Sequence, residues 1–216
     1  MRGTTAVVAG AAGIALGVAS FGADLASGAW LTVLQFVAST GFAWGCAAFA
    51  PAVLARTRAG AMAAGIAVLC LATGGYYGLN LVSGRWRADG LGPVLAAAAY
   101  WTVLSVAGGA ALGVLAHLVR SARPRPAAVA GGLVCGLLAG AGIDIVVSLL
   151  AAGDHGRQRL AEGALQAVLG VVVATWAFGR RPGARDWAGY GLAAVAACVA
   201  GASAWGAVES VPVAGF

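Results

Sequence analysis

Seven apolar runs follow one another along the chain, and each is about long enough to cross a lipid bilayer. A helix needs roughly 20 mainly apolar residues to span a hydrocarbon layer ~30 Å thick. Only 9% of the residues are charged and 61% are hydrophobic, whereas about a quarter of a soluble domain is charged. The pattern predicts an all-α integral membrane protein, a bundle of seven transmembrane helices in a single domain over residues 1–216. The predicted spans are 5–23, 29–53, 60–82, 91–119, 127–151, 159–179 and 187–208.

Arginines in the short connectors predict how this bundle is oriented. With the N-terminus in the cytoplasm, the inner side of the membrane holds nine arginines and the outer side holds four. Cytoplasmic loops of membrane proteins carry the excess of basic residues, so we expect the N-terminus inside. The run at 5–23 also resembles the apolar part of a cleaved signal peptide. Since only Arg2 precedes it, we interpret this run as a transmembrane helix.

The residue types exclude several kinds of site. All thirteen basic residues are arginine, so no lysine is available for a retinal Schiff base or a phosphate-binding loop. The four cysteines lie in apolar runs without a CxxC pair, and His117 and His155 lie on opposite sides of the predicted membrane. We expect neither a metal nor a cofactor. The net charge of +6 comes from arginines grouped between the spans, so we expect membrane lipid and no nucleic acid as partner.

Two acids fall within predicted spans. Asp144, in the stretch GAGIDIVVSLL, lies about seven residues, or ~10 Å, from the outer end of its helix. Ser148 follows one turn later on the same helix face, and Glu162 and Gln166 form another i, i+4 pair in the next span. A charge at membrane depth costs about 3 kcal/mol, so such acids are functional candidates.

If the helices alternate in direction, aromatic and amide side chains from three other spans should lie in the same outer half of the membrane, with Tyr100 and Trp101 near its middle. They are Gln35, Tyr76, Tyr77, Asn80, Tyr100 and Trp101. Aromatic rings stabilise a desolvated cation by about 0.5–2 kcal/mol each. We therefore expect a substrate-binding pocket lined by rings, with Asp144 and Glu162 as its catalytic acids and Ser148 and Gln166 beside them.

Simpler explanations of the same residues stay open. Asp144 can hydrogen-bond to a neighbouring helix, Glu162 can lie in the headgroup region, and the tyrosines can pack without a ligand. Aromatic side chains near helix ends often form interfacial belts, as we expect for Trp30, Trp187, Tyr190 and Trp205. Glycines recur four apart, which lets helices pack closely within the chain. We find no internal sequence repeat, which argues against a transporter built from inverted halves.

Three stretches carry a family resemblance: FVASTGFAWGCAAF, GGYYGLNLV and AYWTVLSVAGGAALGVLAHLVRS. They resemble a family of small multi-pass membrane proteins from actinobacteria that is labelled only as a domain of unknown function. The resemblance covers about the middle half of the chain. It implies a bundle of about seven helices in the bacterial cytoplasmic membrane and supplies no activity.

Three functions fit these observations. In a membrane terpene cyclase, the intramembrane acid protonates a hydrophobic isoprenoid and the rings stabilise the carbocations that follow. In a proton-coupled transporter or binding protein, the acid exchanges a proton for a small amphiphilic or cationic molecule. In a structural role, the small-residue faces pack against another membrane component. The one-sided polar residues place the cyclase slightly ahead of the transporter.

Overall fold

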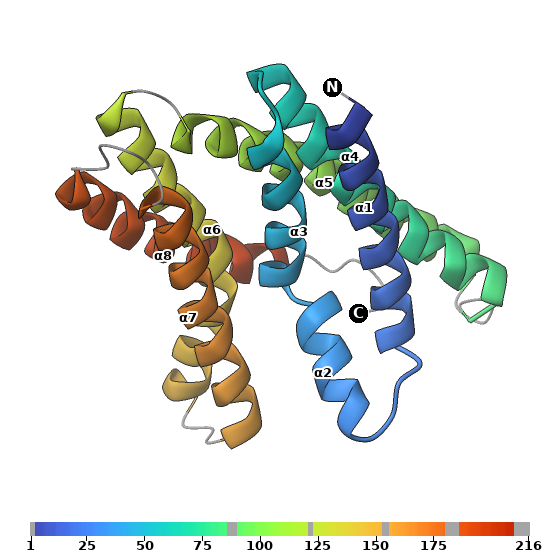
Figure 1. Cartoon of the computed structure of the whole chain (residues 1–216). Helices are drawn as coiled ribbons and strands as arrows, with labels where there is room; N and C mark the ends of the chain where they lie inside the picture. The colour runs from blue at the N-terminus through green and yellow to red at the C-terminus, as the bar shows by residue number, and fades with distance from the viewer. Residues whose placement is uncertain (1–2, 86–89, 121–122, 153–155, 180–185, 210–216) are drawn as a thin grey trace. The chain divides into compact units, whose positions relative to one another are not determined.

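The computed structural model describes residues 3–85, 90–120, 123–152, 156–179 and 186–209, and all the regular secondary structure in these segments is helical. The predicted all-α class is therefore confirmed for this part of the chain. The helices, shown in Figure 1, are α1 Gly3–Ala23, α2 Ala29–Ala38, α3 Gly41–Leu54, α4 Arg58–Ser83, α5 Leu91–Val119, α6 Pro124–Ala151, α7 Arg157–Gly179 and α8 Trp187–Glu209.

The helices have the length and the surface of a membrane protein. By length and composition, α1, α4, α5, α6 and α7 are each able to cross a membrane, while Gly41–Leu54 and Trp187–Ser203 are shorter apolar helices. Large apolar side chains point outward, with Val82 85% and Leu192 76% exposed. Water does not favour so much exposed apolar surface, and lipid does.

The continuous helix predicted for 29–53 is wrong, because the chain breaks it at Ser39 and Thr40. Thr40 is extended, with φ −103° and ψ 147°, and its hydroxyl oxygen accepts a 3.2 Å hydrogen bond from the N–H of Ala43, which caps α3. The same hydroxyl donates to the carbonyl of Phe36 at 3.0 Å. Hydroxyl side chains compete for backbone hydrogen bonds in this way, and hydropathy does not register it. Figure 1 shows α2 and α3 as separate helices.

Side chains satisfy the backbone at this break. The carbonyl of Ala38, at the end of α2, accepts a 2.6 Å hydrogen bond from the Ser20 hydroxyl of α1 and a 2.7 Å bond from the Trp44 indole N–H of α3. A hydrocarbon layer contains no water to bond such groups, so a break within it has to be satisfied by protein. The α2–α3 break is therefore compatible with membrane depth.

The chain forms two compact units, with the boundary inside α5 between Val114 and Leu115. In the first unit, glycines bring α1 against α4. A Cβ atom added to Gly13 would lie 2.7 Å from the Val68 carbonyl oxygen, and one added to Gly17 would lie 2.6 Å from the Ala72 carbonyl oxygen. The contacting residue numbers rise together, so α1 and α4 run parallel.

Helix α5 returns along α4 in the same unit. Gly109 of α5 meets Gly65 of α4, and Gly113 of α5 meets Met62. Here one residue number rises as the other falls, so α4 and α5 are antiparallel. The predicted use of glycine pairs for packing within the chain is seen in α1 and α5. It is not seen at Gly74, where an added Cβ atom would meet nothing within 4 Å.

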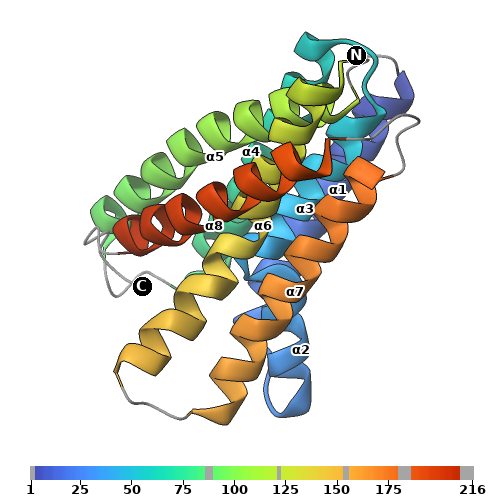
Figure 2. The same cartoon turned by 90° about the vertical axis from the view of Figure 1, so that its left-hand side faces the viewer.

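The second unit is built around α6. Its glycine stripe packs on α8, and the contacting pairs are Gly132 with Ala193, Gly136 with Ala197, and Gly140 with Gly201. These numbers rise together, so α6 and α8 run parallel. On α7, by contrast, Gly163 meets Gly142 of α6 and Gly170 meets Ala139, so α6 and α7 are antiparallel; Figure 2 shows them side by side.

Both units contain a pair of parallel helices, although the sequence shows no internal repeat. Each contains one pair of parallel helices in close contact: α1 with α4 in the first unit, which also holds most of α5, and α6 with α8 in the second. The chain returns between them through α2 and α3 in the first unit and through α7 in the second. The order of helix directions in α1 to α4 is therefore similar to that in α6 to α8, although the two sequences are not.

Candidate functional site

A polar cluster joins the ends of α1 and α4 in the first unit. The phenolic hydroxyl of Tyr76 donates a 2.8 Å hydrogen bond to Oδ2 of Asp24. Arg85 places its Nη1 atom 3.8 Å from the same carboxylate oxygen and donates from Nη2 to the Asp24 carbonyl at 3.4 Å. Both charged side chains are about one third exposed, at 34% for Arg85 and 32% for Asp24.

The parallel packing of α1 on α4 explains this cluster. The close contact between Gly17 and Ala72 lies two helical turns before Asp24 and one turn before Tyr76. The N–H of Asp24 still bonds the carbonyl of Ser20 at 3.4 Å, which carries the last turn of α1 one residue further. At the end of α4, Gly84 has φ 72°, a left-handed conformation that glycine adopts readily, and Arg85 follows it directly.

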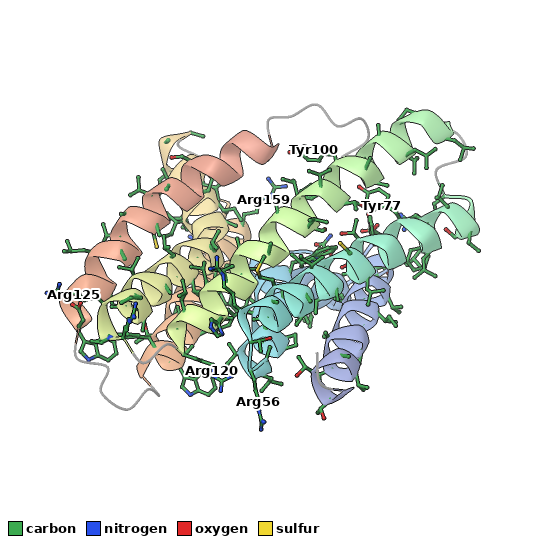
Figure 3. All side chains as sticks on the ribbon, turned by 90° about the horizontal axis from the view of Figure 1, so that it is seen from above. Arg56, Tyr77, Tyr100, Arg120, Arg125 and Arg159 are labelled. Atoms are coloured by element: carbon green, nitrogen blue, oxygen red, sulfur yellow. The ribbon has the colours of Figure 1, made fainter. Side chains whose placement is uncertain are left out.

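Aromatic side chains gather beside this cluster, between α4 and α5. Tyr77 is only 6% exposed and packs with Val94 and Ala97 of α5, while Tyr76 and Trp101 border the same group. The Tyr76 and Tyr77 rings meet edge to face, with centroids 5.2 Å apart. Figure 3 shows Tyr77 where α4 passes α5. The antiparallel hairpin thus places the first turns of α5 against the last turns of α4.

Asn80 is the most deeply buried polar residue of this region, with 0% exposure. Its Nδ2 donates to the carbonyl of Tyr76 at 3.0 Å. Its Oδ1 atom is buried and accepts no hydrogen bond within the described residues. A buried acceptor left without a donor costs about 1–3 kcal/mol. Such an atom in a native structure calls for a specific explanation.

Two hydroxyls that sequence reasoning missed extend the polar side of the α4–α5 contact. Thr73 and Ser105 share a 2.7 Å hydrogen bond between their side chains, and both residues are buried. Thr73 lies one turn before Tyr77 on the same face of α4. Single hydroxyls in apolar helices carry no signal in the sequence, because such groups usually bond the carbonyl four residues earlier.

Six of the residues predicted to line the pocket belong to the first unit, and the structure brings four of them together: Tyr76, Tyr77, Asn80 and Trp101. Tyr100 adjoins the group through its edge-to-face contact with the Trp101 ring, at a centroid distance of 5.5 Å. Gln35 is different. It lies exposed on α2, and its side chain makes no hydrogen bond within the described part of the chain.

Asp24 and Arg85 are functional candidates that sequence reasoning missed. Asp24 comes directly after the predicted span 5–23, and Arg85 comes three residues after the span 60–82. The predicted spans place both residues on the same side of the membrane. The missing information was that these two helices are in contact and run parallel, which brings their ends together. An acid does lie beside the tyrosine pair, and the residue is Asp24.

Asp144 belongs to the second unit. It lies one turn beyond Gly140, in line with the glycine stripe of α6 that packs on α8. Its side chain is half-buried, and within the described residues its carboxylate forms no hydrogen bond or ion pair. Ser148, one turn further along α6, is exposed.

Glu162 and Gln166 lie on α7 where that helix approaches α6. Glu162 is half-buried and accepts a 3.1 Å hydrogen bond from Gln158. Gln166 is 4% exposed, and its Cβ atom lies 2.8 Å from the position of a Cβ atom added to Gly142 of α6. The second unit therefore has a polar group of its own at the α6–α7 contact.

The predicted interfacial role of Tyr190 is wrong. Tyr190 is 7% exposed, and its ring stacks on Phe178 at a centroid distance of 5.0 Å. Its hydroxyl also shares a 2.9 Å hydrogen bond with Thr175, so the polar end that an interfacial tyrosine gives to water is satisfied inside the unit. Trp187 is 47% exposed. The side chains of Trp30 and Trp205, and His155, lie outside the described residues.

An apolar groove of about 410 Å³ adjoins the break between α2 and α3. It is more open than enclosed, and its lining is apolar. It is lined by Ala15, Leu16, Ala19, Phe36, Val37, Phe42, Ala43, Cys46 and Ala47. Among the described residues, no three His, Cys, Asp or Glu side chains gather as ligands for a metal ion.

Comparison with known proteins gives one match. A family described as a family of unknown function, DUF6518, matches residues 2–211, which is nearly the whole chain. No curated protein matches, and no solved structure matches.

Proposed function

The chain belongs to this family of unknown function, and we propose that it is a membrane carrier that binds small amphiphilic cations. In this proposal it crosses the bacterial cytoplasmic membrane seven times, with its N-terminus in the cytoplasm. The observation that supports a carrier best is the repeated order of helix directions in the two units.

The parallel helices support seven crossings. Since α1 and α4 run parallel, the chain has to return to its starting side between them, and α2 with α3 is the segment available. The pair then forms one broken crossing. In the second unit, α6 and α8 are parallel with α7 reversed, which adds three crossings to the one made by α5.

This topology gives two groups of three crossings, α1 to α4 and α6 to α8, with α5 between them in the chain. If every segment crosses, the two groups have the same order of crossing directions. Some secondary transporters are built from parallel repeats, and their substrate sites commonly adjoin discontinuous helices. The α2–α3 break, with an apolar groove beside it, is a discontinuity of this kind.

The cluster at Asp24 supports a cationic ligand. A carboxylate next to the edge-to-face Tyr76 and Tyr77 rings combines a negative charge with π faces, and each contributes to holding a cation. A cyclase would instead need a protonated acid at the rings. The acid found there is paired with the Arg85 guanidinium at 3.8 Å. We therefore rank the carrier ahead of the cyclase.

The test uses purified protein reconstituted in sealed vesicles. Phenethylguanidinium is a suitable probe because it is amphiphilic and stays charged at neutral pH. We expect uptake above that of protein-free vesicles, which Asp24→Asn lowers about tenfold, since a hydrogen bond to a charged group contributes about 1.5–3 kcal/mol. Equal uptake with and without protein overturns the carrier. Cyclised product from farnesyl or geranylgeranyl substrates in detergent favours the cyclase instead.

A further inference from the structure

The buried Asn80 Oδ1 atom narrows the chemistry of the ligand. It is an acceptor with no donor among the described residues, on a side chain that is 0% exposed. The orientation of the amide is fixed, because its Nδ2 atom already donates to the carbonyl of Tyr76. Turning the amide over would set two oxygens against each other. The position therefore presents an acceptor to whatever binds there.

The surroundings of Asn80 are those of the aromatic cluster. Tyr76 and Tyr77 precede it by four and three residues on α4, so all three share one side of the helix. That side packs on the first turns of α5 through Val94 and Ala97. Asn80 also lies only three residues before the end of α4 at Ser83, within ~5 Å of it along the helix axis.

The free acceptor, the rings and the nearby anion set different requirements. The rings accept any cation, quaternary ammonium included. The Asp24 carboxylate accepts the Tyr76 hydroxyl and lies 3.8 Å from Nη1 of Arg85, so a cationic ligand shares this negative charge with the arginine. Only the Asn80 oxygen requires a hydrogen-bond donor, and a quaternary ammonium has none to offer. Together they select a cation that carries N–H groups.

We propose that the aromatic cluster between α4 and α5 binds the guanidinium or protonated amine end of an organic cation, with Asn80 Oδ1 accepting one of its N–H bonds. This inference rests on the proposed function and names its substrate class. Binding opens the contact between the last turns of α4 and the first turns of α5, where Tyr77 now packs.

The experiment compares two permanently charged probes of similar size, phenethylguanidinium and trimethyl(phenethyl)ammonium, by titration calorimetry on the purified chain in detergent. We expect the parent protein to bind the guanidinium about tenfold or more tightly, the typical effect of one hydrogen bond to a charged group. Asn80→Leu should remove this preference, because it should weaken the binding of the guanidinium probe and leave the binding of the quaternary ammonium probe unchanged. Gln158→Leu, at an exposed amide on α7 in the second unit, should leave both affinities unchanged.

The outcomes separate this inference from the function on which it rests. Equal affinity of the parent protein for both probes overturns the inference and leaves a cation carrier. If Asn80→Leu lowers the affinity for both probes equally, the inference is also overturned, since the residue then acts through structure alone. Binding of neither probe overturns the proposed function itself. If Asn80→Leu does not fold, Asn80→Ala removes the same acceptor with a smaller side chain, and a preference retained in that variant overturns the inference.

Discussion

Tyr76 and Asp24 lie 52 positions apart in the chain, and a 2.8 Å hydrogen bond joins the phenolic hydroxyl of one to the carboxylate of the other. The bond ties the end of α4 to the residue that follows α1. It exists because two helices separated by a broken helix pack in parallel. It also makes Asp24 the acid at the centre of the proposed cation site.

Replacement of Asp24 tests that assignment. Asp24→Asn keeps an oxygen for the Tyr76 hydroxyl and removes the charge, so we expect phenethylguanidinium affinity to fall about tenfold, as for the loss of a hydrogen bond to a charged group. Calorimetry measures the change. Glu162→Gln, in the second unit, should bind as the parent does. If Glu162→Gln lowers the affinity for phenethylguanidinium and Asp24→Asn does not, the site lies at α7 instead.

Removal of the Asp144 charge tests proton coupling. Among the described residues Asp144 has no hydrogen-bond or ion-pair partner, and a charge at membrane depth is costly, so the proposed carrier assigns proton coupling to this group. We expect Asp144→Asn to lose the response of cation uptake to an imposed pH gradient and to keep cation binding. Vesicle uptake measured with and without the gradient gives the answer. A variant as responsive as the parent protein assigns Asp144 a structural role.

Glycine substitutions test the close helix contacts. A Cβ atom at Gly17 would lie 2.6 Å from the Ala72 carbonyl oxygen, whereas one at Gly74 would meet nothing within 4 Å. Gly17→Ala should therefore destabilise the protein by about 1–3 kcal/mol, the usual range for overpacking. Gly74→Ala is the matched control, and it should be neutral or stabilising by up to about 1 kcal/mol through helix propensity. Thermal unfolding in detergent compares them, and equal effects would contradict the α1–α4 contact.

The hydrogen bond between Thr73 and Ser105 should stabilise the α4–α5 hairpin. Thr73→Val removes one partner, and we expect a loss of about 1 kcal/mol in the free energy of unfolding. Adding Ser105→Ala should cost less than its effect in the parent protein, because the partner is already gone. A double-mutant cycle from unfolding curves measures this coupling. Additive effects would mean that the two hydroxyls do not interact.

Single cysteines in a cysteine-free background test the broken crossing. If α2 and α3 together return the chain, Ser27→Cys and Ser83→Cys lie on one side of the membrane and Arg56→Cys lies on the other. An impermeant maleimide added to intact cells should label the first two and leave the third protected until the cells are opened. Labelling of Ser27→Cys and Arg56→Cys from the same side would make α2 and α3 a re-entrant hairpin.

Some features of the fold and of the candidate site can be predicted from the local sequence alone. Hydropathy alone predicts the all-α class and the runs that form α1, α4, α5, α6 and α7, because each must cover about the same apolar thickness. The grouping of Tyr76, Tyr77 and Asn80 follows from helical spacing. The role of Trp101 follows from the alternation of helix direction, which places the start of α5 at the end of α4.

Other features depend on contacts between distant residues, and only the tertiary structure decides them. The α2–α3 break rests on hydroxyl and indole groups that bond the backbone, and hydropathy does not measure these bonds. The pairing of Asp24 with Tyr76 and Arg85, and the burial of Tyr190, rest on which helices touch and in which direction. In lipid every apolar face is equally well solvated, so apolar pattern leaves partner choice open, and close packing at glycines makes that choice.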